Sequence, residues 1–195
     1  LHAFHNELQL IVELFKERRQ GILIRNYTIP YASGYRSDNI PYGNIGITSN
    51  KGIDASLTYT KNFKRSSFIS FTGSFNYNQN RNIYDGLPPW QYPWLNRQGH
   101  PIDQRFGYVA LGLFADSTEI LASPTQAGDV RPGDIKYKDL NGDGIINSYD
   151  QTAIGYGAVP RMLYGLNFGF GYRGFDLSLF FQGAGLVDFN YASGF

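Results

Sequence analysis

Hydrophobic and polar residues alternate along five segments of the chain. Alternation with a period of two places hydrophobic side chains on one face of an extended strand and polar side chains on the other. The five segments have lengths that suit a tilted strand crossing a membrane, which takes about 9–11 residues. They are residues 7–16, 53–60, 67–78, 162–172 and 175–182.

Two of these segments illustrate the pattern. In 53–60 the hydrophobic face carries Ile53, Ala55, Leu57 and Tyr59, and the polar face carries Asp54, Ser56, Thr58 and Thr60. In 162–172 the large side chains are Met162, Tyr164, Leu166, Phe168, Phe170 and Tyr172. The opposite face of that segment is mostly glycine, with Asn167. Each segment is therefore predicted to form a two-faced β-strand.

The connections between these strands differ greatly in length. Short polar turns are expected at residues 5–6, 61–66 and 173–174, and long linkers at 25–50 and 80–161. Alternation alone also fits a soluble β-sandwich. Short turns at one rim with long loops at the other are typical of outer-membrane barrels, whereas a sandwich rarely contains an excursion of about 80 residues.

The predicted fold class is therefore all-β, with residues 1–195 forming part of a large antiparallel transmembrane β-barrel. Short turns of such barrels face the periplasm, so residues 80–161 are expected to be a long, folded extracellular loop. Residues 106–114 are expected to add a short pair of strands within it.

The composition supports contact with a membrane through strands. Fifteen Tyr, fifteen Phe and two Trp make up 16% of the chain, and aromatic residues suit the two membrane–water boundaries of a barrel. The mean hydropathy is −0.32, and the longest apolar stretch, 106–115, is about half of the ~20 residues that a membrane-spanning helix needs. Lys16, Arg18 and Arg19 form a basic run where the first strand is expected to meet lipid headgroups or anionic lipopolysaccharide.

Several function classes lack sequence support. A net charge of +1 gives no electrostatic reason to expect nucleic acid as a partner. The absence of cysteine excludes disulfides and thiolate metal sites. No nucleophile, zinc-protease or phosphate-binding motif occurs, and His2, His5 and His100 are isolated, so the chain is not expected to be an enzyme. Because it begins at Leu1 without a signal peptide, we expect an excerpt of a longer protein.

The sharpest local motif lies at residues 139–150, DLNGDGIINSYD. It has the spacing of a twelve-residue calcium loop, with Gly144 at the sharp turn. The predicted ligands, five through side-chain oxygens and Ile145 through its carbonyl, are Asp139, Asn141, Asp143, Ile145, Asn147 and Asp150. Asp150 replaces the usual bidentate Glu, so weak, structural calcium binding is expected. The alternative is a pair of tight turns without a metal.

Aromatic residues also gather within the long loop, where Trp90, Tyr92 and Trp94 follow Leu87-Pro88-Pro89. Their flat rings suit stacking on a carbohydrate or peptide, but they are equally suited to packing within the loop or against a partner protein. They are candidate substrate or partner contacts, with packing or an interface favoured.

Several motifs together resemble the late-barrel region of SusC/RagA-like TonB-dependent transporters. The longest are GDIKYKDLNGDGIIN at 133–147, followed by Ile154-Gly155, and YGLNFGFGYRGFDLSLFFQG at 164–183. GHPI at 99–102, FGY at 106–108, NIG at 44–46 and NKG at 50–52 match the same family in the same order.

This resemblance implies a 22-stranded barrel in the bacterial outer membrane that is plugged by an N-terminal domain and powered through TonB. The plug and the segment that contacts TonB are expected to lie outside this chain. It further implies a SusD-like surface lipoprotein as a lid and import of glycans or peptides too large for simple porins. The rival interpretation is a secreted, calcium-stabilised β-sandwich, either an adhesin or a carbohydrate-binding module, in which the large faces pack inward. A dockerin-bearing enzyme shares only the calcium loop, which here occurs once and among strands.

Overall fold

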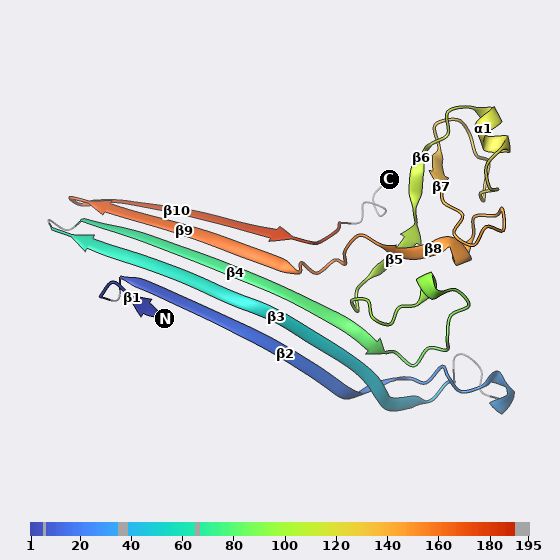
Figure 1. Ribbon diagram of the computed structural model, residues 1–195, viewed down its shortest axis with the longest axis horizontal. Helices are drawn as coiled ribbons and strands as arrows, with labels where there is room; N and C mark the ends of the chain where they lie inside the picture. The colour runs from blue at the N-terminus through green and yellow to red at the C-terminus, as the bar shows by residue number, and fades with distance from the viewer. Residues whose placement is uncertain (6, 35–38, 65–66, 190–195) are drawn as a thin grey trace.

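A single antiparallel sheet of six strands dominates the computed structural model, which describes residues 1–5, 7–34, 39–64 and 67–189 (Figure 1). The strand order is β1-β2-β3-β4-β9-β10, so β9 follows β4 in space although a long connection separates them in sequence. The strands are β1 (His2–Ala3), β2 (Leu8–Arg25), β3 (Tyr42–Phe63), β4 (Ser67–Tyr84), β9 (Met162–Tyr172) and β10 (Phe175–Gly185). The predicted all-β, antiparallel class is confirmed.

The strand ends show where the alternation pattern was insufficient. β9 has the predicted bounds, and the turn at Arg173-Gly174 has the two positive φ angles, 49° and 86°, of a tight hairpin. The predicted linker 25–50 is wrong in its second part, because β3 already begins at Tyr42. Likewise β3 continues to Phe63, inside the predicted turn 61–66, and β4 continues to Tyr84, beyond the predicted loop start at 80. Asn6 and residues 65–66 of the predicted turns lie outside the described residues.

These strand ends have a physical reason. Residues 42–52 and 78–84 are rich in Asn, Ser, Thr, Gly and Tyr, so the hydrophobic alternation stops before the strands do. The backbone ladder nevertheless continues, with Lys51 opposite Gln79 and Asn50 opposite Asn80. Backbone pairing needs no hydrophobic face, so pattern and strand end at different residues.

The register aligns the hydrophobic residues of five strands on one face of the sheet, here called the outer face. Residues directly opposite each other in a ladder share a face. One such row runs through Leu8, Tyr59, Phe71, Phe168 and Leu179. Phe71 and Phe168 make a tilted ring contact with 5.0 Å between centroids. The other face carries mostly small and polar residues, as in the row Thr60, Ser70, Gly169 and Ser178.

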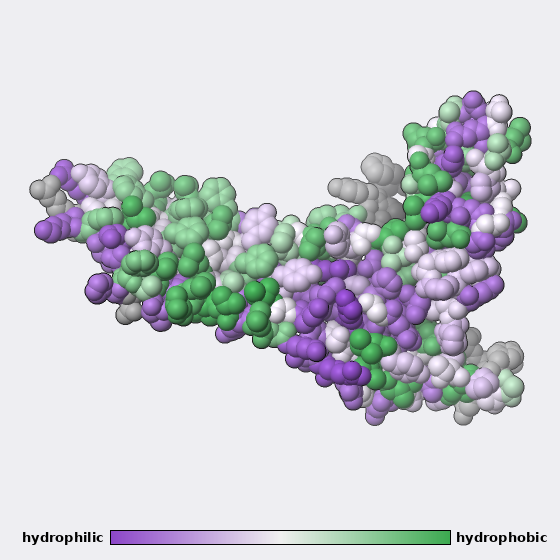
Figure 2. Space-filling model, viewed as in Figure 1, coloured by the Kyte–Doolittle hydropathy of each residue, from purple (hydrophilic) through white to green (hydrophobic). Residues whose placement is uncertain are grey.

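No second layer covers the outer face in the described part of the chain. Leu14 is 79% exposed and Phe168 44%. The buried hydrophobic residues there are Leu95, Phe114 and Ile146, none of which belongs to the sheet. Figure 2 shows hydrophobic side chains gathered over the half of the sheet nearer the short turns, with mostly hydrophilic ones over the other half. Within the described residues, no second sheet faces these hydrophobic residues, as the rival β-sandwich interpretation requires.

The glycines of β9 fit the crowded inner face. Ser70 and Ser74 of β4 lie against Gly169 and Gly165, and the ring of Phe68 lies over Gly171. A Cβ atom on Gly171 would overlap that ring. The glycine face predicted for residues 162–172 thus leaves room for side chains of the neighbouring strand.

The connection between β4 and β9 folds into small elements of its own. They are η2 (Pro93–Leu95), β5 (Arg105–Tyr108), β6 (Ala110–Leu113), α1 (Ser117–Leu121), β7 (Ile135–Tyr137), η3 (Ser148–Asp150) and β8 (Gln151–Ile154). A further short helix, η1 (Tyr31–Ser33), lies between β2 and β3. No helix within the described ranges is long and apolar enough to span a membrane.

The predicted pairing within residues 106–114 is wrong in its partners. Strands do form there, but β5 pairs with β8 and β6 pairs with β7. These partners come from residues 135–154, so the connection closes on itself through contacts distant in sequence.

Candidate functional site

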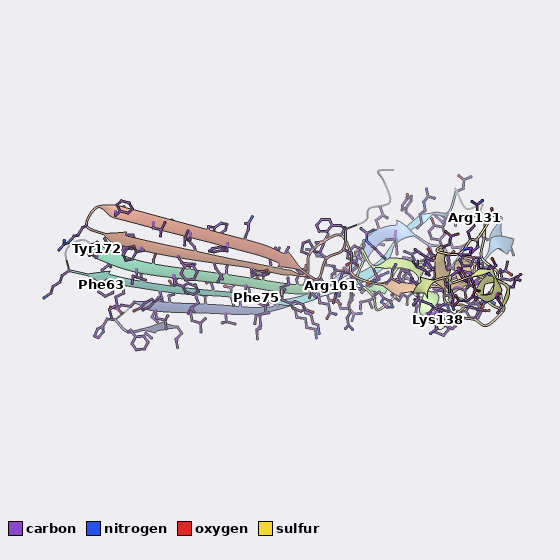
Figure 3. All side chains as sticks on the ribbon, turned by 90° about the horizontal axis from the view of Figure 1, so that it is seen from above. Phe63, Phe75, Arg131, Lys138, Arg161 and Tyr172 are labelled. Atoms are coloured by element: carbon purple, nitrogen blue, oxygen red, sulfur yellow. The ribbon has the colours of Figure 1, made fainter. Side chains whose placement is uncertain are left out.

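The connection between β4 and β9, here called the loop region (residues 85–161), lies at the end of the sheet opposite the short turns (Figure 1). Figure 3 shows Phe63 and Tyr172 at the turn end and Arg131 and Lys138 at the far end. The loop region contains both groups of residues that the sequence singled out for binding.

The loop 139–150 is organised around the carboxylate of Asp139. Its two oxygens accept hydrogen bonds from the backbone N–H of Gly142 at 2.6 Å and of Gly144 at 2.8 Å. Both glycines have positive φ angles, 75° and 80°, which other residues rarely adopt. The two glycines therefore let the backbone turn its amides toward Asp139.

These amides also determine the charge of Asp139. The backbone N–H of Gly144 is the main cause that holds the pKa of Asp139 below its usual range, with further hydrogen bonds from the backbone N–H groups of Gly142 and Asp143, while desolvation opposes the shift. The carboxylate is therefore ionised at neutral pH, as a calcium ligand must be.

Asp150 closes the other end of the loop and has no exposed surface. It accepts hydrogen bonds from the backbone N–H of Leu140 at 2.8 Å and of Asn147 at 2.9 Å. Asn147 in turn caps η3 by accepting from the N–H of Tyr149 at 2.8 Å, and its own N–H donating to Asp150 is the reciprocal bond of a capping box. A buried carboxylate with such donors ties residues 140 and 147 together.

The remaining predicted ligands lie in the same loop. Asp143 accepts from the N–H of Ile145 at 2.8 Å and from the side-chain amide of Asn141 at 2.8 Å. The Ile145 carbonyl receives a long contact of 3.4 Å from the side-chain amide of Asn147. Within the described residues, no three His, Cys, Asp or Glu side chains are grouped closely enough to hold a metal ion. A cation would share these oxygens with the amides, so the calcium site stays a prediction.

The aromatic residues contact this loop. Tyr92 and Trp94 stack with 4.7 Å between ring centroids, and Tyr92 meets the ring of Tyr149 edge-on at 5.7 Å. The Trp94 indole N–H donates to the carbonyl of Tyr149 at 2.7 Å. Trp90 remains 41% exposed. Tyr92 and Trp94 thus pack inside the loop region, and Trp90 offers the freer ring; its contact with a substrate or partner stays a prediction.

Thr125 is an anchor that the sequence analysis did not single out. Its N–H donates to the carbonyl of Gly144, and its carbonyl accepts from Ile146, both at 2.8 Å. These bonds fix the middle of the loop 139–150 against the segment after α1. No motif marks Thr125, because the contact uses only its backbone.

The loop region is also hydrogen-bonded to the last residues of β4, beyond Tyr77, where the pairing of β4 with β9 ends. Asn82 donates through its N–H to the carbonyl of His100 at 2.8 Å and accepts from the N–H of Gly99 at 2.7 Å. The side chain of Asn80 accepts from the N–H of Ile102 at 2.8 Å. Loop residues therefore take the place of a neighbouring strand there.

Fold and site together define a class, namely a segment of a large membrane β-barrel with a folded loop region at one mouth. Curated relatives make the class specific. The chain is 28% identical over 193 residues to TonB-dependent receptor P3 of Formosa agariphila, covering 92% of this chain and 19% of that protein. It is 29% identical over 178 residues to TonB-dependent receptor P26 of the same organism, covering 85% and 17%. The chain thus spans about a fifth of the length of these relatives; no family model matches it.

Solved structures show the same fold. The RagAB peptide importer in its open-open state matches with a TM-score of 0.67 at 21% identity, over 93% of this chain and 19% of that one. The closed-closed state matches with a TM-score of 0.61 at 21% identity and the same coverage. The predicted likeness to SusC/RagA-like TonB-dependent receptors is confirmed. The relatives are receptors and importers, not enzymes.

Proposed function

We propose that the protein containing this chain imports large nutrients, peptides or glycans, across the bacterial outer membrane by TonB-dependent transport. The observation that carries the proposal is the similarity to TonB-dependent receptors over about nine tenths of the chain. The importer in the matching structures is described as a peptide importer, which favours peptides as the first substrates to test.

The uncovered outer face supports the membrane placement. From Phe63 to Ile53, the outer face of β3 extends over about 33 Å along the strand. Its side chains there are hydrophobic except for Lys61 near the turn end, which pairs with Glu7 at 3.3 Å. At the tilt of about 40° usual for such barrels, this length corresponds to a height of about 25 Å, the apolar band of an outer-membrane barrel. The polar inner face then lines the interior, and the loop region lies on the extracellular side.

A SusD-like surface lipoprotein is the proposed partner at the loop mouth, and TonB acts through parts of the protein outside this chain. The two-component name of the RagAB importer supports such a partnership. Trp90 is the proposed contact for substrate or lipoprotein, because its ring is exposed whereas Trp94 is engaged with Tyr149.

The loop 139–150 is proposed to bind calcium weakly and structurally. The ligand spacing and the ionised Asp139 support this assignment. In this role the ion would join the ends of a loop on which Tyr92 and Trp94 pack.

Uptake by intact cells tests the import function. In the bacterium that encodes the full-length protein, deleting its gene should abolish uptake of fluorescent oligopeptides or oligosaccharides too large for porins. Dissipating the proton-motive force should have the same effect, while uptake of a small sugar through porins continues. Unchanged uptake of both large substrate classes in the deletion strain would refute the proposal, and a copurifying ligand identified by mass spectrometry would name the substrate.

A further inference from the structure

The hydrophobic rows of the outer face, which extend on β3 from Phe63 to Ile53, are here called the hydrophobic band. Four cationic side chains share the outer face just beyond this band. They are Lys16 and Arg18 of β2, Lys51 of β3 and Arg81 of β4, here called the basic patch. Lys16 lies directly opposite Lys51 in the ladder. Arg18 and Arg81 lie on either side of Ser49 in the next row of the same face. All four side chains are exposed.

No acidic residue neutralises the basic patch within these strands. The acidic side chains of β2, β3 and β4 are Glu13, Glu17 and Asp54, and alternation places all of them on the inner face. Arg19, the remaining cation of the basic run, lies on that inner face and pairs with Glu17 at 2.6 Å. Among the described residues, the four patch cations form no ion pair of this kind.

The four positive charges of the basic patch repel one another, and a bound anion would relieve this repulsion. Like charges directly opposite each other in a sheet repel, and Lys16 and Lys51 occupy such positions. Two strand spacings and one two-residue step separate the four side chains, which gives a patch of about 10 Å by 7 Å. An anion with more than one phosphate matches both the size and the charge of the patch.

The neighbouring row indicates what carries the phosphates. Leu14, Ile53 and Tyr77 lie one step below the basic patch on the same face and form the upper edge of the hydrophobic band. A ligand on the basic patch therefore has acyl-sized hydrophobic surface directly beside its anionic group. Free phosphate would use only the charges, whereas a phosphorylated lipid uses both surfaces.

We propose that the basic patch binds the phosphate groups of an anionic lipid in the leaflet on the loop side of the membrane. The inference rests on the proposed membrane placement of the outer face. The lipid's headgroup lies over the basic patch, and its acyl chains lie along the hydrophobic band below Leu14 and Ile53. Binding there neutralises the facing cations and seats the barrel at a fixed depth.

Native mass spectrometry of the full-length protein in detergent tests the proposal, with bisphosphorylated lipid A as the probe. At about 1 kcal/mol per cation, the variant K16Q/K51Q should bind the probe roughly 30-fold more weakly than the wild type. The matched control R131Q/K138Q removes two exposed cations of the loop region, far from the band, and should leave binding unchanged (Figure 3). Lipid A without phosphates should bind the wild type no better than it binds K16Q/K51Q.

A second pair guards against a folding defect. R18Q/R81Q removes the other two patch charges and should give a similar loss, and R18K/R81K, which keeps the charges, should retain binding. Heat-dependent migration in gels reports whether each barrel has assembled. Equal lipid binding by assembled wild-type, K16Q/K51Q and R18Q/R81Q proteins would overturn the proposal, as would full displacement of the lipid by millimolar inorganic phosphate. Nutrient uptake measured in parallel separates this outcome from failure of the import function.

Discussion

The side chain of Asp150 has no solvent exposure, so its oxygens depend on protein groups for hydrogen bonds. The N–H groups of Leu140 and Asn147 donate to its two oxygens, so each buried oxygen is hydrogen-bonded. Asp139 is held in the same way by two glycine amides. The loop is thus built to keep negative charge in a small volume, which a cation would stabilise further.

Calcium should strengthen this loop. We expect removal of calcium with a chelator to increase the rate of proteolysis within residues 85–161 of the full-length protein, because the ligands would lose the ion that joins them. Limited proteolysis with mass spectrometry measures the effect. D139N should abolish the dependence on calcium, since it removes a ligand charge. D129N is the control, because Asp129 is exposed and pairs with Arg131 outside the loop. Identical cleavage with and without chelator would leave only the pair of tight turns.

The strands behave as elements with two unlike surfaces. Phe168 and Asn167 are neighbours in β9, yet one points to the outer face and the other to the inner face. The outer row through Phe168 is hydrophobic across β4, β9 and β10, with Phe71 on one side and Leu179 on the other, so one inserted charge would disturb a continuous hydrophobic surface.

An arginine in each position tests this difference. F168R should destabilise the full-length barrel by ~2–4 kcal/mol if the site lies near the bilayer midplane, because the guanidinium would enter hydrocarbon. N167R should cost much less, since its side chain reaches the water-filled interior. Urea unfolding in lipid vesicles, followed by tryptophan fluorescence, measures both. Equal stability of the two variants would contradict the assignment of the faces.

The sequence predicted the elements better than their ends or their partners. β9 was predicted to the residue, because its alternation begins and ends with the strand and a tight turn follows. The upper parts of β3 and β4 were missed, because backbone ladders hold them together without a hydrophobic face. The partners of β5 and β6 were missed because they depend on contacts between residues 22 to 49 positions apart in the sequence.

In the candidate site, too, local features could be predicted from the sequence and contacts between distant residues could not. The calcium site stays a prediction from the local spacing of residues 139–150, although the structure shows that Asp139, Asp143 and Asp150 accept backbone hydrogen bonds within that loop. Spacing gives no information on the packing of Tyr92 and Trp94 against Tyr149, about 55 residues away.

At the scale of the whole molecule, the sheet has no core of its own. The buried hydrophobic residues among those described, Leu95, Phe114 and Ile146, lie in the loop region, while the sheet exposes Leu14 and Phe168 to its surroundings. Such a sheet depends on lipid and on the strands that complete a barrel.

The isolated chain of 195 residues should therefore not fold as a stable monomer in water. We expect it to aggregate in buffer, because the hydrophobic band and the strand edges at β1 and β10 are unprotected. Size-exclusion chromatography and circular dichroism measure this, with the full-length protein in detergent as the control. A monodisperse monomer with a cooperative thermal transition would argue against the membrane assignment.

The hydrogen bonds from β4 to residues 99–102 give the loop region a mechanical role. The backbone of Asn82 is bonded to Gly99 and His100 as it would be to a neighbouring strand, and the side chain of Asn80 accepts from the N–H of Ile102. Residues 99–102 therefore extend the sheet beyond the end of β9. Residues 99–102 cannot move away from β4 without breaking these hydrogen bonds. Residues 99–102 are therefore expected to keep a constant position relative to β4, and to serve as a rigid border for whatever binds at this end of the sheet.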